Sequence, residues 1–164
     1  FELPVSQWED RFRQTVLLAA AIHDLGKANS HFQRMIEGES LQQPIRHEWV
    51  SVWLAEQAAM KMWLLPAVHG CERCWHTAMA AVAGHHPKHG RCSPQAIDFN
   101  SEVIEVLVEH QDFRSCLTQV QSQLGLGEPP IEMKSIVHGG VKDHDRPKQF
   151  RAMVDRLMTF FVAE

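Results

Sequence analysis

The stretch Ala21-Ile22-His23-Asp24-Leu25-Gly26-Lys27 decides how this chain is interpreted. It closes a strongly apolar run, so a helix packed in the core is expected to end there. A His and an Asp stand side by side at this end, and a Gly and a Lys follow within three residues. An imidazole beside a carboxylate offers two metal ligands, and a metal site needs further ligands from other segments.

Histidines recur in two later motifs, Arg46-His47-Glu48 and Gly84-His85-His86. Taken alone, each motif has a structural interpretation: His47 as a neighbour of a helix cap, and the His pair as part of a surface loop. All three motifs nevertheless lie at predicted helix boundaries beside apolar segments, which favours a shared site. Adjacent residues point about 100° apart on an ideal helix. His23 and Asp24 can still share a site if the helix frays at this end, or if the Asp bridges two metal ions while the His binds only one.

Composition sets the broad class of protein. The chain has 164 residues, which predicts one domain, and a net charge of -4, which excludes a global attraction to nucleic acid. It shows no signal peptide and no apolar stretch of about 18 residues, so we expect a cytoplasmic protein with reduced thiols and no membrane partner. The first residue is not Met and the last residues continue an apolar helical pattern. We therefore expect residues 1–164 to be a piece of a longer chain, cut at both ends.

The apolar spacing predicts an all-α fold without strands. A capping box of Ser6 and Glu9 opens a first helix that should end near Gly26. The apolar face expected for this helix consists of Phe12, Val16, Leu17, Ala20 and Ala21. Further helices are predicted at residues 30–38, 47–65, 74–84, 103–108, 117–124 and 146–162, with polar loops at 39–44 and 87–94.

The ordered motifs H-D-x-G-K, R-H-E and G-H-H, with Phe32-Gln33 between the first two, resemble those of the HD superfamily of metal-dependent phosphohydrolases. More narrowly, they resemble the HD nuclease domain of the type I CRISPR-associated helicase-nuclease. The motifs span about residues 16–90. The resemblance implies a compact helical bundle over residues 1–164, with the metal site between its helices. It also implies a metal-dependent nuclease that cleaves single-stranded DNA in CRISPR antiviral defence.

The resemblance further implies two metal sites that share one aspartate. One ion is expected to be held by Asp24, His47, His85 and His86. The other is expected to be held by His23 and Asp24 together with an upstream His and a late Asp. No His precedes His23, and the candidates for the late Asp are Asp143, Asp145 and Asp155. One site is thus complete in this sequence and the other is incomplete.

Three cationic residues are expected to contact the substrate. The resemblance gives Lys27 a role in phosphate binding or leaving-group stabilisation; the alternative is a solvated lysine at a helix C-terminus. Lys88 and Arg91 follow the His pair and either guide a phosphate backbone or belong to an ordinary loop. Ligands that are mostly imidazoles suit one or two Mn, Fe, Co, Ni or Zn ions. The implied partners are single-stranded DNA, a superfamily 2 helicase, fused or separate, and the RNA-guided CRISPR surveillance complex.

Two other functions stay open: a nucleotide or cyclic-nucleotide phosphohydrolase of the same superfamily, and a catalytically silent HD docking module. A second metal site is also possible, because Cys71-x-x-Cys74 is followed by His76, His89 and Cys92. The alternative is that Cys74 acts as a small hydrophobic residue in a buried helix. We interpret His31 as an exposed helical histidine, and the Trp49-Trp53 pair as core rather than as a platform for stacking bases.

Overall fold

The computed structural model describes residues 5–39, 46–85 and 103–138, and the statements below refer to these ranges. Within them lie the helices α1 (Val5–Ile22), α2 (Ser30–Ile36), α3 (His47–Ala55), α4 (Ala58–Leu64), α5 (Glu72–Gly84) and α6 (Gln111–Leu124). Two short 3-10 helices, η1 (Leu25–Lys27) and η2 (Leu65–Val68), follow α1 and α4. One antiparallel pair of three-residue strands, β1 (Val103–Glu105) and β2 (Ile136–His138), completes the fold. The prediction of an all-α fold is confirmed, with this small strand pair as an addition.

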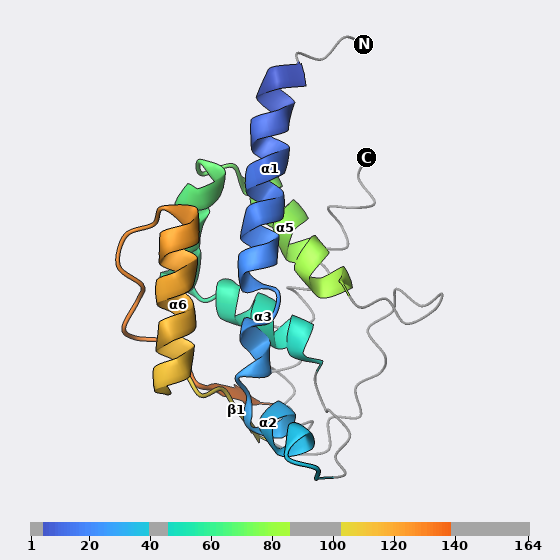
Figure 1. The fold of residues 1–164 in the computed structure, drawn as a ribbon, viewed down its shortest axis with the longest axis vertical. Coiled ribbons are helices and arrows are strands. Elements are labelled where there is room, and N and C mark those ends of the chain that lie inside the picture. The colour runs from blue at the N-terminus through green and yellow to red at the C-terminus, as the bar shows by residue number, and fades with distance from the viewer. Residues whose placement is uncertain (1–4, 40–45, 86–102, 139–164) are drawn as a thin grey trace.

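Helix α1 is the long central element of the structure (Figure 1). It packs against α5 and also contacts α6, while α3 packs on η1 and on α5. Helix α2 and strand β1 contact each other beyond the C-terminal end of α1. The core between the helices includes the fully buried side chains of Leu18, Ile22, Leu54, Trp75 and Met79. This packing places the end of α1 beside the first turn of α3 and the end of α5.

The apolar face predicted for α1 is wrong for most of its residues, although Ala21 does pack against the core. The buried stripe of the helix contains Thr15, Leu18 and Ile22. Phe12 from the predicted face is 71% exposed, and Val16 and Leu17 are exposed as well. Both stripes have the spacing of three and four residues that a helix requires. The contacts of α1 with α5, η2 and α6 select between the two stripes, and the sequence of α1 does not contain that information.

The single helix predicted for residues 47–65 is also wrong. It ends at Ala55 and resumes at Ala58, because Gln57 adopts an extended conformation with ψ 137°. The Gln57 amide donates to the carbonyl oxygen of Lys134 at 3.1 Å and accepts from its N–H at 2.7 Å. These partners lie 77 residues away in the sequence, so local periodicity could not indicate the break.

The helix predicted for residues 103–108 is a strand with an extended continuation. In β1 and beyond it, Ile104, Val106 and Val108 are buried while Glu105 is exposed, which is the two-residue alternation of a strand. The N–H of Val106 donates to Ser135 at 2.6 Å, and that of Leu107 donates to Ala28 at 2.8 Å. Branched side chains favour this conformation once a pairing partner is present.

The remaining boundaries differ from the predictions by a few residues. Helix α1 ends at Ile22, before Gly26, and α2 is capped by Asn29 at its first turn. Helices α5 and α6 begin earlier than predicted, at Glu72 and Gln111. None of the helices in the described ranges has the length and apolarity needed to cross a membrane. The predicted helix at 146–162, the loop at 87–94 and most of the loop at 39–44 lie outside the described residues.

Candidate metal centre

The turn that follows α1 is held against α3 by a buried glycine. A Cβ atom on Gly26 would lie 2.0 Å from the carbonyl oxygen of His47 and 2.6 Å from the backbone nitrogen of Ser51, so only glycine permits this approach. The hydroxyl of Ser51 accepts from the N–H of Gly26 at 2.7 Å and donates to the carbonyl oxygen of His23 at 2.8 Å. The His-Asp turn is thereby fixed beside the residue that begins α3.

The far end of the turn is held by Asn29, which is buried. Its amide nitrogen donates to the carbonyl oxygen of Gly26 at 2.5 Å, and its Oδ1 accepts from the N–H of Phe32 at 2.9 Å. The second bond caps α2. The Phe32 ring that follows lies 5.4 Å from the His47 ring, measured between centroids, and forms one wall of the site. The ammonium group of Lys27 lies 5.8 Å from the centroid of the same ring.

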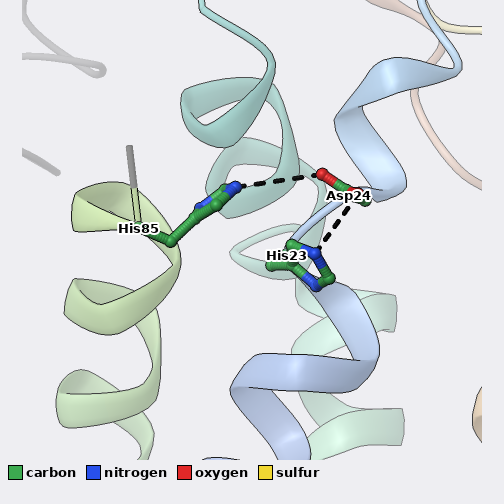
Figure 2. Close-up of side chains that lie close together, drawn as sticks. All are labelled: His23, Asp24 and His85. Atoms are coloured by element: carbon green, nitrogen blue, oxygen red, sulfur yellow. Dashed lines mark ion pairs between the residues drawn. The ribbon is translucent and has the colours of Figure 1, made fainter. Parts of the chain in front are cut away.

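Three imidazoles direct their Nε2 atoms toward the carboxylate of Asp24 (Figure 2 shows His23 and His85). His23 Nε2 lies 3.2 Å from Oδ2, while His47 Nε2 and His85 Nε2 lie 3.4 and 3.8 Å from Oδ1. Ligand atoms of His23, Asp24 and His85 all lie within 4.8 Å of one another. His47 lies at the edge of this group, with its ring centroid 5.6 Å from that of His85. The structure therefore brings together four of the five predicted ligands; their binding of metal stays a prediction.

The hydrogen bonds of the rings determine which nitrogen faces Asp24 as a lone pair. The Nδ1 atom of His23 lies 2.8 Å from the carbonyl oxygen of Ala20, and that of His85 lies 2.6 Å from the carbonyl oxygen of Val82. A carbonyl oxygen only accepts, so Nδ1 carries the proton in both rings. In a neutral ring Nε2 is then a lone pair, directed at a carboxylate oxygen.

This arrangement of acceptors fits a transition metal. Among the described residues, Asp24 Oδ1 is buried and accepts no hydrogen bond. Lone pairs that converge on a carboxylate repel one another unless a positive charge lies between them. Imidazole nitrogens with one carboxylate oxygen are the ligands that Zn, Fe, Co, Ni and Mn ions accept. The residues present thus fit the predicted group of ions.

Charges around the site keep Asp24 ionised. Burial acts to raise the pKa of Asp24, but the hydrogen bond from Lys27 at 2.7 Å and the electrostatic effects of His23, Lys27 and His47 outweigh it. The pKa of Asp24 therefore lies below its ordinary value. Burial also lowers the pKa of His47, against the opposing effect of the Glu48 and Asp24 carboxylates. A carboxylate and a neutral imidazole are the forms that bind a metal ion.

Several predicted residues lie outside the described ranges: His86, Lys88, Arg91, Asp143, Asp145 and Asp155. The alternative zinc site likewise stays a prediction, since His89 and Cys92 are outside these ranges. Within them, Cys71 has another role, because its sulfur accepts from the N–H of Cys74 at 3.2 Å and caps α5.

The interpretation of His31 as exposed is wrong: it is 5% exposed, on the inner side of α2. The interpretation of Trp49 and Trp53 is confirmed, since both pack against the core. Two residues that support the site, Asn29 and Ser51, were not singled out from the sequence, and Glu48 of the R-H-E motif was given no role there. Ser51 follows His47 by four residues and so shares its helix face, which is a weak signal.

Comparison with known proteins identifies the family of the chain. Residues 3–154 match the family described as "Cas3, HD domain". The chain belongs to this family. A relative from Myxococcus xanthus (strain DK1622), the "Putative CRISPR-associated nuclease/helicase Cas3", is 36% identical over 143 residues, which cover 84% of this chain and 19% of the relative. No solved structure matches the chain. The family inferred from the motifs is confirmed, and the Cas3 HD domain is an HD-type hydrolase domain of the CRISPR-associated nucleases.

The match covers only a small part of the Myxococcus relative. The chain spans about a fifth of the length of the Myxococcus relative. The nuclease/helicase named there is therefore much longer than this Cas3 HD domain.

Proposed function

We propose that the chain is a metal-dependent endonuclease that cleaves single-stranded DNA in CRISPR antiviral defence. The observation that supports this most directly is the convergence of three imidazole nitrogens on Asp24, with Lys27 beside them. A divalent transition metal bound there would lower the pKa of a coordinated water and polarise the scissile phosphate.

The residues of the chain have separate tasks in this proposal. Asp24 shares its two carboxylate oxygens between ligand positions, and the proposed ligands around it are His23, His47, His85 and His86. Lys27 forms an ion pair with Oδ2 at 2.7 Å and keeps its side chain 37% exposed. It is therefore able to face a phosphate oxygen from the solvent side of the site and to stabilise the charge that develops there. Lys88 and Arg91 guide the phosphate backbone.

The net charge bears on how DNA reaches the site. With -4 overall, the chain does not attract a polyanion from a distance. A partner that delivers DNA to the site would make long-range attraction unnecessary. The Myxococcus relative is named as a nuclease/helicase. We propose that a superfamily 2 helicase, fused or separate, feeds single-stranded DNA to the domain in the cytoplasm. An RNA-guided CRISPR surveillance complex loads that helicase.

Circular single-stranded DNA tests the activity, because a circle is cut only by an endonuclease. The chain is incubated with Mn²⁺ or Ni²⁺ and either the circle or a panel of nucleotides and cyclic nucleotides. We expect the circle to be cut and Asp24→Asn to abolish cutting. Asp112→Asn is the matched control, because this side chain is 90% exposed on α6, away from the site, and its loss should change nothing.

The other outcomes identify the alternatives. Intact DNA beside hydrolysed nucleotides would favour the phosphohydrolase. A chain that binds no transition metal and cuts neither substrate would favour the silent docking module.

A further inference from the structure

Glu48 is a buried carboxylate beside a proposed metal ligand. Only 1% of its side chain is exposed. Its Oε1 forms an ion pair with the guanidinium of Arg46, and its Oε2 lies 3.3 Å from Nδ1 of His47. His47 is thus placed between two carboxylates, with Glu48 on its Nδ1 side and Asp24 on its Nε2 side.

The other two imidazoles of the site, those of His23 and His85, have backbone oxygens beside their Nδ1 atoms. His23 and His85 each follow the last turn of a helix, and each has its Nδ1 close to the carbonyl oxygen three residues earlier. The last carbonyls of a helix lack partners within the helix, so they are available for this purpose. His47 instead begins α3, where the helix presents N–H groups rather than carbonyls. In that turn, the Glu48 side chain offers an oxygen to Nδ1 of His47 at 3.3 Å.

We propose that Glu48 is a positioning residue: it accepts the Nδ1 proton of His47 and so turns the Nε2 lone pair toward the metal ion. This inference rests on the proposed function, because it assumes that a metal binds at Nε2. A carboxylate behind an imidazole ligand fixes the tautomer and makes the ring a stronger donor.

The surroundings of Glu48 agree with this role. Burial of a carboxylate is unfavourable unless it is paired. Arg46 and the N-terminal end of α3 both stabilise the negative charge, since Glu48 lies in the first turn of the helix. A core position of this kind is normally apolar, and the neighbouring residues Val50 and Val52 are fully buried. The carboxylate is therefore retained at a place where packing alone favours a hydrophobic residue.

Metal affinity tests the proposal without reference to activity. The purified 164-residue chain is titrated with Co²⁺ against a chelator, and the visible absorption of the bound ion is recorded. We expect Glu48→Gln to weaken Co²⁺ binding by about 10- to 100-fold and to alter the absorption band. Glu48→Asp restores the charge at a shorter reach and should recover part of the affinity.

Glu56→Gln is the matched control. This carboxylate ends the same helix and accepts from the indole N–H of Trp75 at 2.7 Å, outside the site. Its replacement should leave Co²⁺ affinity unchanged. Thermal unfolding in a chelator, recorded for every variant, separates loss of folding from loss of binding. If Glu48→Gln does not fold, the Co²⁺ affinity of Glu48→Asp is compared with that of the wild-type chain, and a lower affinity supports the positioning role.

Two results would overturn the inference, and they differ in what else they affect. If the wild-type chain binds Co²⁺ and the folded Glu48 variants bind it equally well, Glu48 does not position His47, while the proposed function stands. If the wild-type chain binds no divalent transition metal, the inference and the proposed function both fail.

Discussion

Replacement of Gly26 by alanine should loosen the contact between the His-Asp turn and α3. The added methyl group would meet the His47 carbonyl oxygen at 2.0 Å and the Ser51 backbone nitrogen at 2.6 Å. Both are backbone atoms of α3, so a side-chain rotation cannot relieve the clash, and η1 has to move away from the helix. That movement lengthens the hydrogen bond from the Gly26 N–H to the Ser51 hydroxyl, now 2.7 Å.

The expected loss of stability follows from these two effects. Overfilling a well-packed site costs about 1–3 kcal/mol. A weakened buried hydrogen bond costs a further 0.5–1.5 kcal/mol or so. We therefore expect Gly26→Ala to lower the free energy of unfolding by about 2–4 kcal/mol, a large part of the 5–15 kcal/mol or so that is usual for a domain. Metal affinity should fall as well, because Asp24 moves relative to His47.

Urea unfolding followed by circular dichroism measures this change. Gly127→Ala is the matched control, because a Cβ at that residue meets nothing within 4 Å. It should alter the free energy of unfolding by less than about 0.5 kcal/mol. A Gly26→Ala chain as stable as the control would show that η1 and α3 are not in the close contact described here, and the reasoning that ties Asp24 to His47 would fail.

Three further predictions concern other parts of the structure. Asn29→Ala removes the cap of α2 and a buried bond to Gly26, and should cost about 1–2 kcal/mol in urea unfolding; an unchanged midpoint would contradict the cap. The pKa of His47 is lowered from 6.5 in the fold, so the metal-free chain should be fully stable above pH 6.5 and lose stability as the pH falls below it, because the unfolded chain then takes up a proton that the folded chain does not. In thermal scans with chelator, His47→Gln should flatten this decline, and an equal decline in both chains would contradict it. Burial acts to raise the pKa of the Cys71 thiol, but hydrogen bonds from Cys74 and the charge of Arg11 lower it overall, whereas burial raises the pKa of Cys74. Iodoacetamide at neutral pH should therefore alkylate Cys71 before Cys74, as peptide mass spectrometry would show; equal rates for these two thiols would contradict the cap geometry.

The sequence predicts which side chains come together at the site better than it predicts the elements that carry them. The helix ends at His23 and His85 are marked by apolar runs that stop, and these local signals were sufficient. The break at Gln57 depends on Lys134, and strand β1 depends on β2, so neither has a local signal. Short apolar segments such as residues 103–108 fit a strand and a helix almost equally well.

The supporting residues were missed for a related reason. Ser51 and Asn29 act through hydrogen bonds that hold the turn, and Glu48 acts through ionic contacts with Arg46 and His47. A serine in a helix or an asparagine in a loop is common, and its partner is fixed only when the chain folds. His31 was misplaced because one polar residue in a short helix does not show which side packs inward.

The end of α1 solves a geometric problem that the His-Asp pair creates. Continued as a helix, the chain would direct Asp24 about 100° away from His23, and the two could not share one ion. The last backbone bond of α1 runs from the N–H of His23 to Ala19, after which Asp24 adopts φ -105° and ψ 0°. The same termination leaves the Ala20 carbonyl free for Nδ1 of His23. One helix end therefore turns the carboxylate toward the site and fixes the ring beside it. The end of α5 likewise fixes the ring of His85, through the carbonyl oxygen of Val82. The proposed ligands at helix ends are thus held by backbone carbonyls, whereas for His47 at a helix start we propose that Glu48 supplies the oxygen.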